Sequence, residues 1–118
     1  MDNPKRKILI VDDNPDLAQF VSKMLEVHYW TSIVPDGKTA IQKVFSESPD
    51  LVLLDLKLPD IPGTEVLKKI KEMNEETAVI VMTAYGGEQL AVGLMKAGAV
   101  DYLSKPFDEE NLLGAVHN

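Results

Sequence analysis

The chain has 118 residues, of which 45% are apolar and 26% charged, a composition typical of one globular domain with a self-sufficient core. A formal net charge of −7 disfavours direct binding to nucleic acid or anionic membranes, and the absence of cysteine excludes disulfides, zinc–thiolate sites and thiol nucleophiles. Because no apolar run approaches the roughly 20 residues of a membrane span and the N-terminus lacks the apolar core of a signal peptide, we expect a cytoplasmic protein.

The first half of the chain begins with two predicted strand–helix units. Residues 7–11 form an apolar run typical of a strand buried on both faces, whereas residues 30–34 are a weaker strand expected near an edge. The first helix should begin after Asn14 as its cap, with Pro15 in the first turn, and the second should begin near Asp36–Gly37. The residues expected to face inward are Leu17, Phe20, Val21, Met24 and Leu25 in the first helix, and Ala40, Ile41, Val44 and Phe45 in the second.

Three further units follow, with strands predicted at residues 51–54, 78–82 and, near an edge, 101–104. The third helix should follow Pro62–Gly63, the fourth should stop at Gly98 as a left-handed cap, and the fifth should begin at Asp108. The inward faces are predicted to be Val66, Leu67 and Ile70, then Leu90, Ala91, Leu94 and Met95, then Leu112, Leu113 and Val116.

Five strand–helix units in strict alternation predict a parallel sheet between two helix layers, the doubly wound α/β class. The first, third and fourth strands are the most uniformly apolar, so we expect them to be central, in the flavodoxin-like strand order 2-1-3-4-5. Sheets of this class place their functional site at the carboxyl ends of the strands.

Reactive side chains gather at those predicted strand ends. Asp12 and Asp13 follow the first strand, Asp55 the third, Thr83 the fourth and Lys105 the fifth. Two carboxylates about 4 Å apart repel by roughly 4 kcal/mol at an effective dielectric constant near 20, so three acids in one pocket need a cation among them. Their hard oxygen atoms favour Mg²⁺, for which Mn²⁺ can substitute. We therefore predict that Asp55 is a carboxylate nucleophile toward a phosphoryl group, with Lys105 and the metal neutralising charge and Thr83 donating a hydrogen bond.

Four segments, "ILIVDDNP", "PDLVLLDLKLPDIPG", "VIVMTAYG" and "KAGAVDYLSKPF", resemble the receiver domain of two-component response regulators. The resemblance covers about residues 7–113 and implies a signalling switch in which Asp55 accepts a phosphoryl group from a histidine kinase. It further implies that Asp13 ligates Mg²⁺ directly and Asp12 through water, while Asp55 and the backbone carbonyl of Lys57 complete the protein ligands.

The same resemblance assigns the remaining roles. Thr83 would be the switch hydroxyl, and Tyr102 the aromatic residue that rotates inward when Thr83 moves toward the phosphate. Lys105 would pair with the phosphoryl group, and the Lys105–Pro106 peptide would be cis. The side chains of Lys57 and Tyr85 flank the expected path of attacking water, and we hypothesise that the bulky Tyr85 slows hydrolysis of the acyl phosphate.

The segment that runs from "TAYGG" through "MKAGA" is most similar to receivers of nitrogen-regulator-type, sigma-54-dependent transcriptional activators. We therefore expect residues 1–118 to be one receiver domain at the N-terminal end of a longer protein. A stand-alone receiver that acts through protein–protein contacts is the alternative. Phosphorylation should change the surface of the fourth helix, fifth strand and fifth helix, and thereby control a C-terminal output domain, a downstream protein or a homodimer.

Two other classes share parts of this pattern. A flavodoxin-like mononucleotide binder needs a hydroxyl- and glycine-rich phosphate loop after the first strand, where this chain has the repulsive sequence "DDNPD". A haloacid-dehalogenase-type phosphatase also uses a strand-end aspartate and Mg²⁺. That class has a second acid two residues after the nucleophile, where Lys57 stands here, and usually a cap domain that 118 residues cannot supply. Both alternatives are disfavoured.

Overall fold

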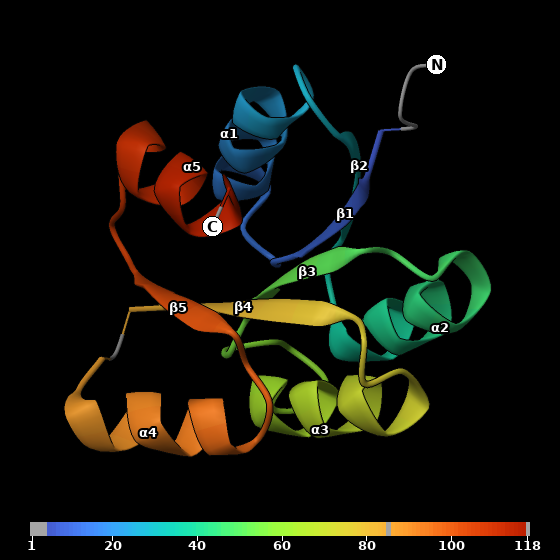
Figure 1. Ribbon diagram of the computed structural model, residues 1–118, viewed down its shortest axis with the longest axis vertical. Coiled ribbons are helices and arrows are strands. Elements are labelled where there is room, and N and C mark those ends of the chain that lie inside the picture. The colour runs from blue at the N-terminus through green and yellow to red at the C-terminus, as the bar shows by residue number, and fades with distance from the viewer. Residues whose placement is uncertain (1–4, 85, 118) are drawn as a thin grey trace.

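The computed structural model describes residues 5–84 and 86–117, in which five strands alternate with five helices (Figure 1). The elements are β1 (Lys7–Val11), α1 (Pro15–Leu25), β2 (Trp30–Val34), α2 (Gly37–Glu47), β3 (Leu51–Asp55), α3 (Gly63–Met73), β4 (Ala78–Thr83), α4 (Glu88–Lys96), β5 (Asp101–Ser104) and α5 (Glu109–His117). All five predicted strand–helix units are present, which confirms the predicted fold class. Among the described residues, no helix combines the length and the apolar character that crossing a membrane requires.

The strands form one parallel sheet in the order β2-β1-β3-β4-β5, as predicted, with the two weaker strands at its edges. The register places Val11 of β1 beside Leu54 of β3, and Leu54 beside Val81 of β4. The carboxyl ends of the three central strands are therefore level with one another. β3 and β4 each run one residue further than predicted, so Asp55 and Thr83 belong to the strands themselves and share their rigidity.

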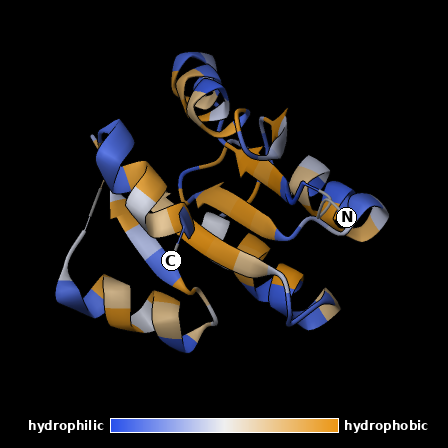
Figure 2. Ribbon diagram, turned by 45° about the horizontal axis from the view of Figure 1, so that its top comes forward, coloured by the Kyte–Doolittle hydropathy of each residue, from blue (hydrophilic) through white to orange (hydrophobic). Residues whose placement is uncertain are grey.

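Two helix layers cover the sheet, with α1 and α5 on one face and α2, α3 and α4 on the other (Figure 1). Successive strand residues alternate between these layers: Ile8 and Ile10 face α1 and α5, whereas Leu9 and Val11 face the opposite layer. The central strands are hydrophobic along most of their length (Figure 2), and each fully buried Leu, Ile or Val contributes about 1.5–3 kcal/mol. The sheet is thus a rigid platform on which the strand ends are held in place.

The helix boundaries confirm the predicted caps. The Asn14 side chain accepts hydrogen bonds from the N–H groups of Asp16 and Leu17 at the start of α1. At the start of α5, the Asp108 carboxylate accepts one from Asn111, 2.8 Å away. Gly98, just after α4, has a φ of +112°, in the left-handed region that favours glycine.

Three residues predicted to face the core are instead exposed: Phe45 by 80%, Met95 by 45% and Phe20 by 37%. Each lies beside the buried stripe of its helix rather than within it, and that stripe is narrower than the predicted apolar face. In α2 the buried residues are Gly37, Ala40 and Val44, and Phe45 projects about 100° further round the helix. The predicted inward faces of α1, α2 and α4 were therefore too wide.

Candidate functional site

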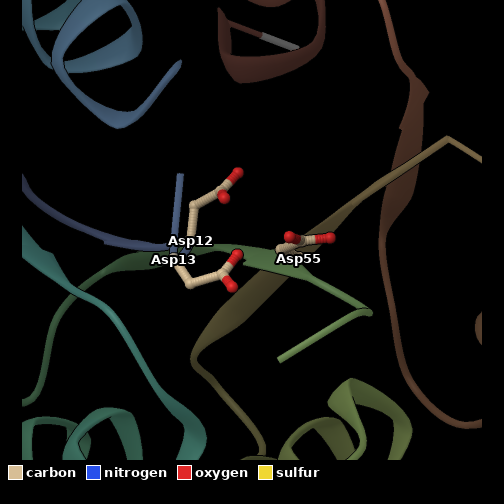
Figure 3. A group of neighbouring side chains, drawn as sticks. All are labelled: Asp12, Asp13 and Asp55. Atoms are coloured by element: carbon tan, nitrogen blue, oxygen red, sulfur yellow. The ribbon is translucent and has the colours of Figure 1, made fainter. Parts of the chain in front are cut away.

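Three carboxylates converge at the carboxyl edge of the sheet. Asp12 and Asp13 extend from the end of β1 toward Asp55 at the end of β3 (Figure 3). One oxygen from each of the three carboxylates lies within 4.8 Å of the others. They line a cleft of about 670 Å³ that Thr83 and Lys105 also line. The structure therefore brings all five predicted strand-end residues together in one place.

Asp12 is held rigidly because the residue is only 2% exposed and both of its carboxylate oxygens have partners. Its Oδ1 accepts a hydrogen bond from the Asn14 N–H at 2.9 Å, and its Oδ2 lies 3.1 Å from Lys105 Nζ. Its own N–H donates to the Val34 carbonyl on β2, 3.1 Å away. This carboxylate is fixed in the wall of the cleft.

Asp55 is 6% exposed and lies at the centre of the group. Its Oδ1 accepts a hydrogen bond from the Lys57 N–H at 3.2 Å, and its Oδ2 lies 3.3 Å from Lys105 Nζ. Burial raises the pKa of Asp55 above its ordinary value; the Lys57 N–H opposes this, the charge of Asp12 raises the pKa further, and Lys105 lowers it. An ionised Asp55 is therefore stabilised by any further positive charge that enters the cleft.

Asp13 differs from its neighbours because its side chain is exposed to solvent. With Lys105 counted, the three carboxylates and one ammonium carry a net charge of −2, which matches one divalent cation. Carboxylate oxygens at the ends of two neighbouring strands, open to water on one side, fit Mg²⁺ or Mn²⁺, which prefer oxygen ligands and keep some of their water. Lys57, whose carbonyl the family resemblance adds to the ligands, lines the same cleft.

The two predicted switch residues occupy different environments. Thr83 is 3% exposed and lines the cleft. Tyr102 is half-buried on β5, where it packs against the core on the side of α2, α3 and α4 rather than in the cleft. The Lys105 N–H donates to the Thr83 carbonyl at 2.8 Å, and the Lys105–Pro106 peptide is cis, as the resemblance implies.

Part of the cleft wall was not anticipated from the sequence. Leu58, Pro59 and Leu90 add apolar surface beside the carboxylates. The first two lie just after β3, which is the only sequence signal for their role, and Leu90 was predicted simply as a core residue. Tyr85, predicted to tune the rate of hydrolysis, lies outside the described residues.

Comparison with known proteins identifies relatives that match almost the whole chain. The family model described as the response regulator receiver domain matches residues 8–117. The response regulator ArlR of Staphylococcus saprophyticus is 42% identical over 111 residues, covering 93% of this chain and 50% of ArlR. The regulatory protein LuxO of Vibrio cholerae is 41% identical over 110 residues, covering 92% of this chain and 24% of LuxO.

Solved structures agree with these relatives. The CheY-like response regulator receiver domain protein from Methanospirillum hungatei matches with a TM-score of 0.91 at 31% identity, covering 97% of this chain and 92% of that one. This chain thus spans nearly all of a receiver domain but half or less of ArlR and LuxO. The findings confirm the predicted resemblance, including that to transcriptional regulators, and do not favour the phosphatase alternative. The chain belongs to the response regulator receiver domain family of two-component systems, whose members are phosphorylation-dependent signalling switches rather than classical enzymes.

Proposed function

We propose that Asp55 is the phosphoacceptor of this receiver and that it takes its phosphoryl group from a histidine kinase. The observation that carries this proposal is the position of its carboxylate, in contact with Lys105 Nζ at 3.3 Å and beside two further acids in an open cleft. Asp12 has both oxygens engaged and Asp13 has no comparable rigid setting. Asp55 therefore combines reach, rigidity and a nearby cation.

In the proposed metal site, the direct ligands are Asp13, Asp55 and the backbone carbonyl of Lys57. Asp12 binds the metal through water. Bound Mg²⁺ would supply positive charge that offsets the repulsion between the carboxylates and an incoming phosphoryl group. Mn²⁺ should substitute, because it accepts the same oxygen ligands. The packing of Asp12 against Asn14 and Lys105 supports its more distant role, since its oxygens are already engaged.

In the transfer step, an Asp55 oxygen attacks phosphorus while the N–P bond of the donor phosphohistidine breaks and its electron pair stays on the histidine nitrogen. The Lys105 ammonium offsets charge on the phosphoryl oxygens, and the Thr83 hydroxyl donates a hydrogen bond to one of them. Both side chains line the cleft: Thr83 ends β4, which pairs with β3, and Lys105 follows directly after β5, which pairs with β4. The chain catalyses only its own phosphorylation and dephosphorylation.

Phosphorylation adds a charge of about −1.5 to −2 beside Thr83 and Lys105, and these groups then favour a different arrangement of the neighbouring elements. We assign the response to the surface of α4, β5 and α5, with Thr83 and Tyr102 as the switch pair. Val92, Met95 and Val100 on or beside α4 are 52%, 45% and 53% exposed, which suits a surface that binds another protein. The proposed partners are a C-terminal output domain, a downstream protein or a second phosphorylated copy, acting in transcription regulation.

Three expectations from the sequence stay predictions: that these residues are the N-terminal part of a longer protein rather than a stand-alone receiver, that it is cytoplasmic, and that Tyr85 slows dephosphorylation. The last has a direct measurement. Tyr85→Ala should shorten the lifetime of the phosphorylated protein. Lys57→Ala, which removes the other side chain expected beside the path of the attacking water, is measured alongside for comparison. An unchanged lifetime in Tyr85→Ala would refute that assignment.

The central experiment is to incubate the purified chain with acetyl phosphate and Mg²⁺ and to record its intact mass and oligomeric state. The wild type should gain one phosphoryl group and Asp55→Asn none, and chelation of the metal should abolish the gain. Asp101→Asn is the matched control, because Asp101 begins β5 and so lies at the end of the strands opposite to the cleft. This variant should be phosphorylated normally. Phosphorylation of Asp55→Asn at the wild-type rate would overturn the assignment.

A further inference from the structure

The loop between β3 and α3, residues 56–62, lines the cleft with its first four residues, 56–59, among which is the proposed metal ligand Lys57. Its two ends are in direct backbone contact. The Gly63 N–H donates to the Leu56 carbonyl at 2.9 Å, and a Cβ on Gly63 would lie 2.5 Å from Leu56 Cα and 2.6 Å from the Asp55 carbonyl oxygen. The base of the loop is therefore fixed against the phosphoacceptor strand.

The tip of the loop is fixed by a second, longer-range contact. Asp60 Oδ1 accepts a hydrogen bond from the Gly37 N–H at 2.8 Å, and Asp60 Oδ2 accepts one from the Lys38 N–H at 2.9 Å. These donors are the first two residues of α2, more than 20 positions earlier in the chain. One carboxylate thus joins the wall of the cleft to a neighbouring helix.

The contact also completes the start of α2, where the first N–H groups of any helix lack partners within the helix. Asp36, the N-cap, accepts from the Thr39 N–H at 2.8 Å, and the Asp36 carbonyl accepts from Ala40. Of the first three helix residues, Gly37 and Lys38 have N–H groups that Asp36 does not bind, and the Asp60 carboxylate accepts a hydrogen bond from each. Two carboxylates therefore share one helix end, of which one belongs to the helix and the other to the cleft loop.

Packing and charge support the same contact. A Cβ on Gly37 would lie 2.6 Å from Ile61 Cγ1 and 2.7 Å from Val66 Cγ2, so a larger residue there would push the loop away from α2. Desolvation raises the pKa of Asp60, but hydrogen bonds from the backbone N–H groups of Gly37, Lys38, Ile61 and Asp60 itself together lower it by more, so the pKa lies below its ordinary value. Asp60 is therefore ionised at neutral pH and interacts favourably with the positive end of the α2 dipole.

We propose that Asp60 is a positioning residue for the metal site: it holds the β3–α3 loop against the start of α2, and thereby keeps the Lys57 carbonyl at the cleft. This inference rests on the proposed Mg²⁺ site. Asp60 does not touch the metal or the reacting atoms, so it acts through the backbone of residues 57–60. Loss of a hydrogen-bond partner behind a metal ligand costs about 10–100-fold in metal affinity, and we expect the lower end of that range here because Asp60 acts on Lys57 through the backbone.

The test compares Asp60→Ala with Asp36→Ala, because both remove a cap from α2 but only Asp60 belongs to the loop. The Mg²⁺ dissociation constant is measured by isothermal titration calorimetry or NMR, and stability by urea unfolding. Both variants should unfold at lower urea concentration. Asp60→Ala should bind Mg²⁺ about tenfold more weakly, whereas Asp36→Ala should stay within about twofold of the wild type. Unchanged affinity in Asp60→Ala, or an equal loss in Asp36→Ala, would overturn the inference.

Two further comparisons distinguish a failure of this inference from a failure of the proposed Mg²⁺ site. Wild type and Asp13→Asn are titrated alongside: if the wild type binds no Mg²⁺, the proposed site itself fails, whereas normal wild-type binding isolates the contribution of Asp60. Asp60→Asn keeps the size of the side chain and one acceptor oxygen, so it should fold even if Asp60→Ala does not, and should show a smaller loss of affinity. At saturating Mg²⁺, the phosphorylation rate of either Asp60 variant should return to that of the wild type.

Discussion

Replacing Asp13 by asparagine should stabilise the metal-free protein. Asp13 has oxygens within 4.8 Å of those of Asp12 and Asp55, and within residues 5–84 and 86–117 no ion pair joins it to a cation, because Lys105 contacts the other two acids. At 4.8 Å, one pair of unit charges repels by roughly 0.9 kcal/mol at the dielectric constant of water and roughly 3.5 kcal/mol at an effective value of 20. Since Asp13 is exposed, the lower figure applies, and we expect a gain of about 1 kcal/mol.

The assay is thermal unfolding in a chelator and again in excess Mg²⁺. An unfolding entropy of about 2.1 cal/mol/K per residue over 118 residues gives roughly 0.25 kcal/mol/K, so a gain of about 1 kcal/mol raises the Tm by about 4 °C. A ligand present at 100 times its dissociation constant stabilises the folded state by about 2.7 kcal/mol, so Mg²⁺ should raise the wild-type Tm by roughly 10 °C. Asp13→Asn should gain much less, and the order of the two proteins should reverse.

Two outcomes would refute this reasoning. A lower Tm for Asp13→Asn in chelator would show that the three carboxylates do not repel one another as their separation requires. An equal Mg²⁺ response in both proteins would show that Asp13 is not a ligand. Asp101→Asn controls for the loss of one negative charge elsewhere, and its Mg²⁺ response should equal that of the wild type.

Further predictions concern the cation and the base of the loop. Lys105→Ala removes the ammonium that contacts Asp55 at 3.3 Å, so Mg²⁺ should bind several-fold more tightly in calorimetry while phosphorylation by acetyl phosphate slows; weaker binding would contradict the charge argument. Gly63→Ala should lower the free energy of unfolding by at least about 2 kcal/mol, because the new Cβ would overlap backbone atoms of Leu56 and Asp55 that cannot swing away. The control is Gly93→Ala, because a Cβ on this exposed α4 residue would meet nothing within 4 Å. Urea unfolding of this variant should show a free energy of unfolding about 0.5–1 kcal/mol higher than that of the wild type.

Most of the fold was predictable because each element carries its own local signal. The apolar runs of β1, β3 and β4 have the length and composition of strands buried on both faces, and their central positions follow from that burial. The caps at Asn14, Asp36 and Asp108 are local hydrogen bonds between residues two or three positions apart. The five strand-end side chains were predictable for the same reason, since a parallel sheet brings the ends of its strands to one edge.

Features set by contacts between distant segments were not predictable. The exposure of Phe45 depends on how closely α2 approaches the sheet, which its own periodicity does not determine. The contact from Asp60 to Gly37 and Lys38 joins positions separated by 23 and 22 residues, and a lone aspartate in a loop gives no sign of its partner. Tertiary caps of this kind become visible only when the helix start and the loop are placed together.

The location of the buried polar groups connects stability with switching. Among the described residues, the buried side chains that are polar or charged are those of Asp12, Asp55, Thr77 and Thr83, and all but Thr77 lie at the cleft. Burying two carboxylates there destabilises the folded chain, and one Lys105 ammonium offsets only part of that cost. The proposed metal ion and phosphoryl group would both change the charge inside this cleft. Their binding would act on groups held at the ends of rigid strands, so we expect the conformational response to lie in the loops and helices that follow these strands.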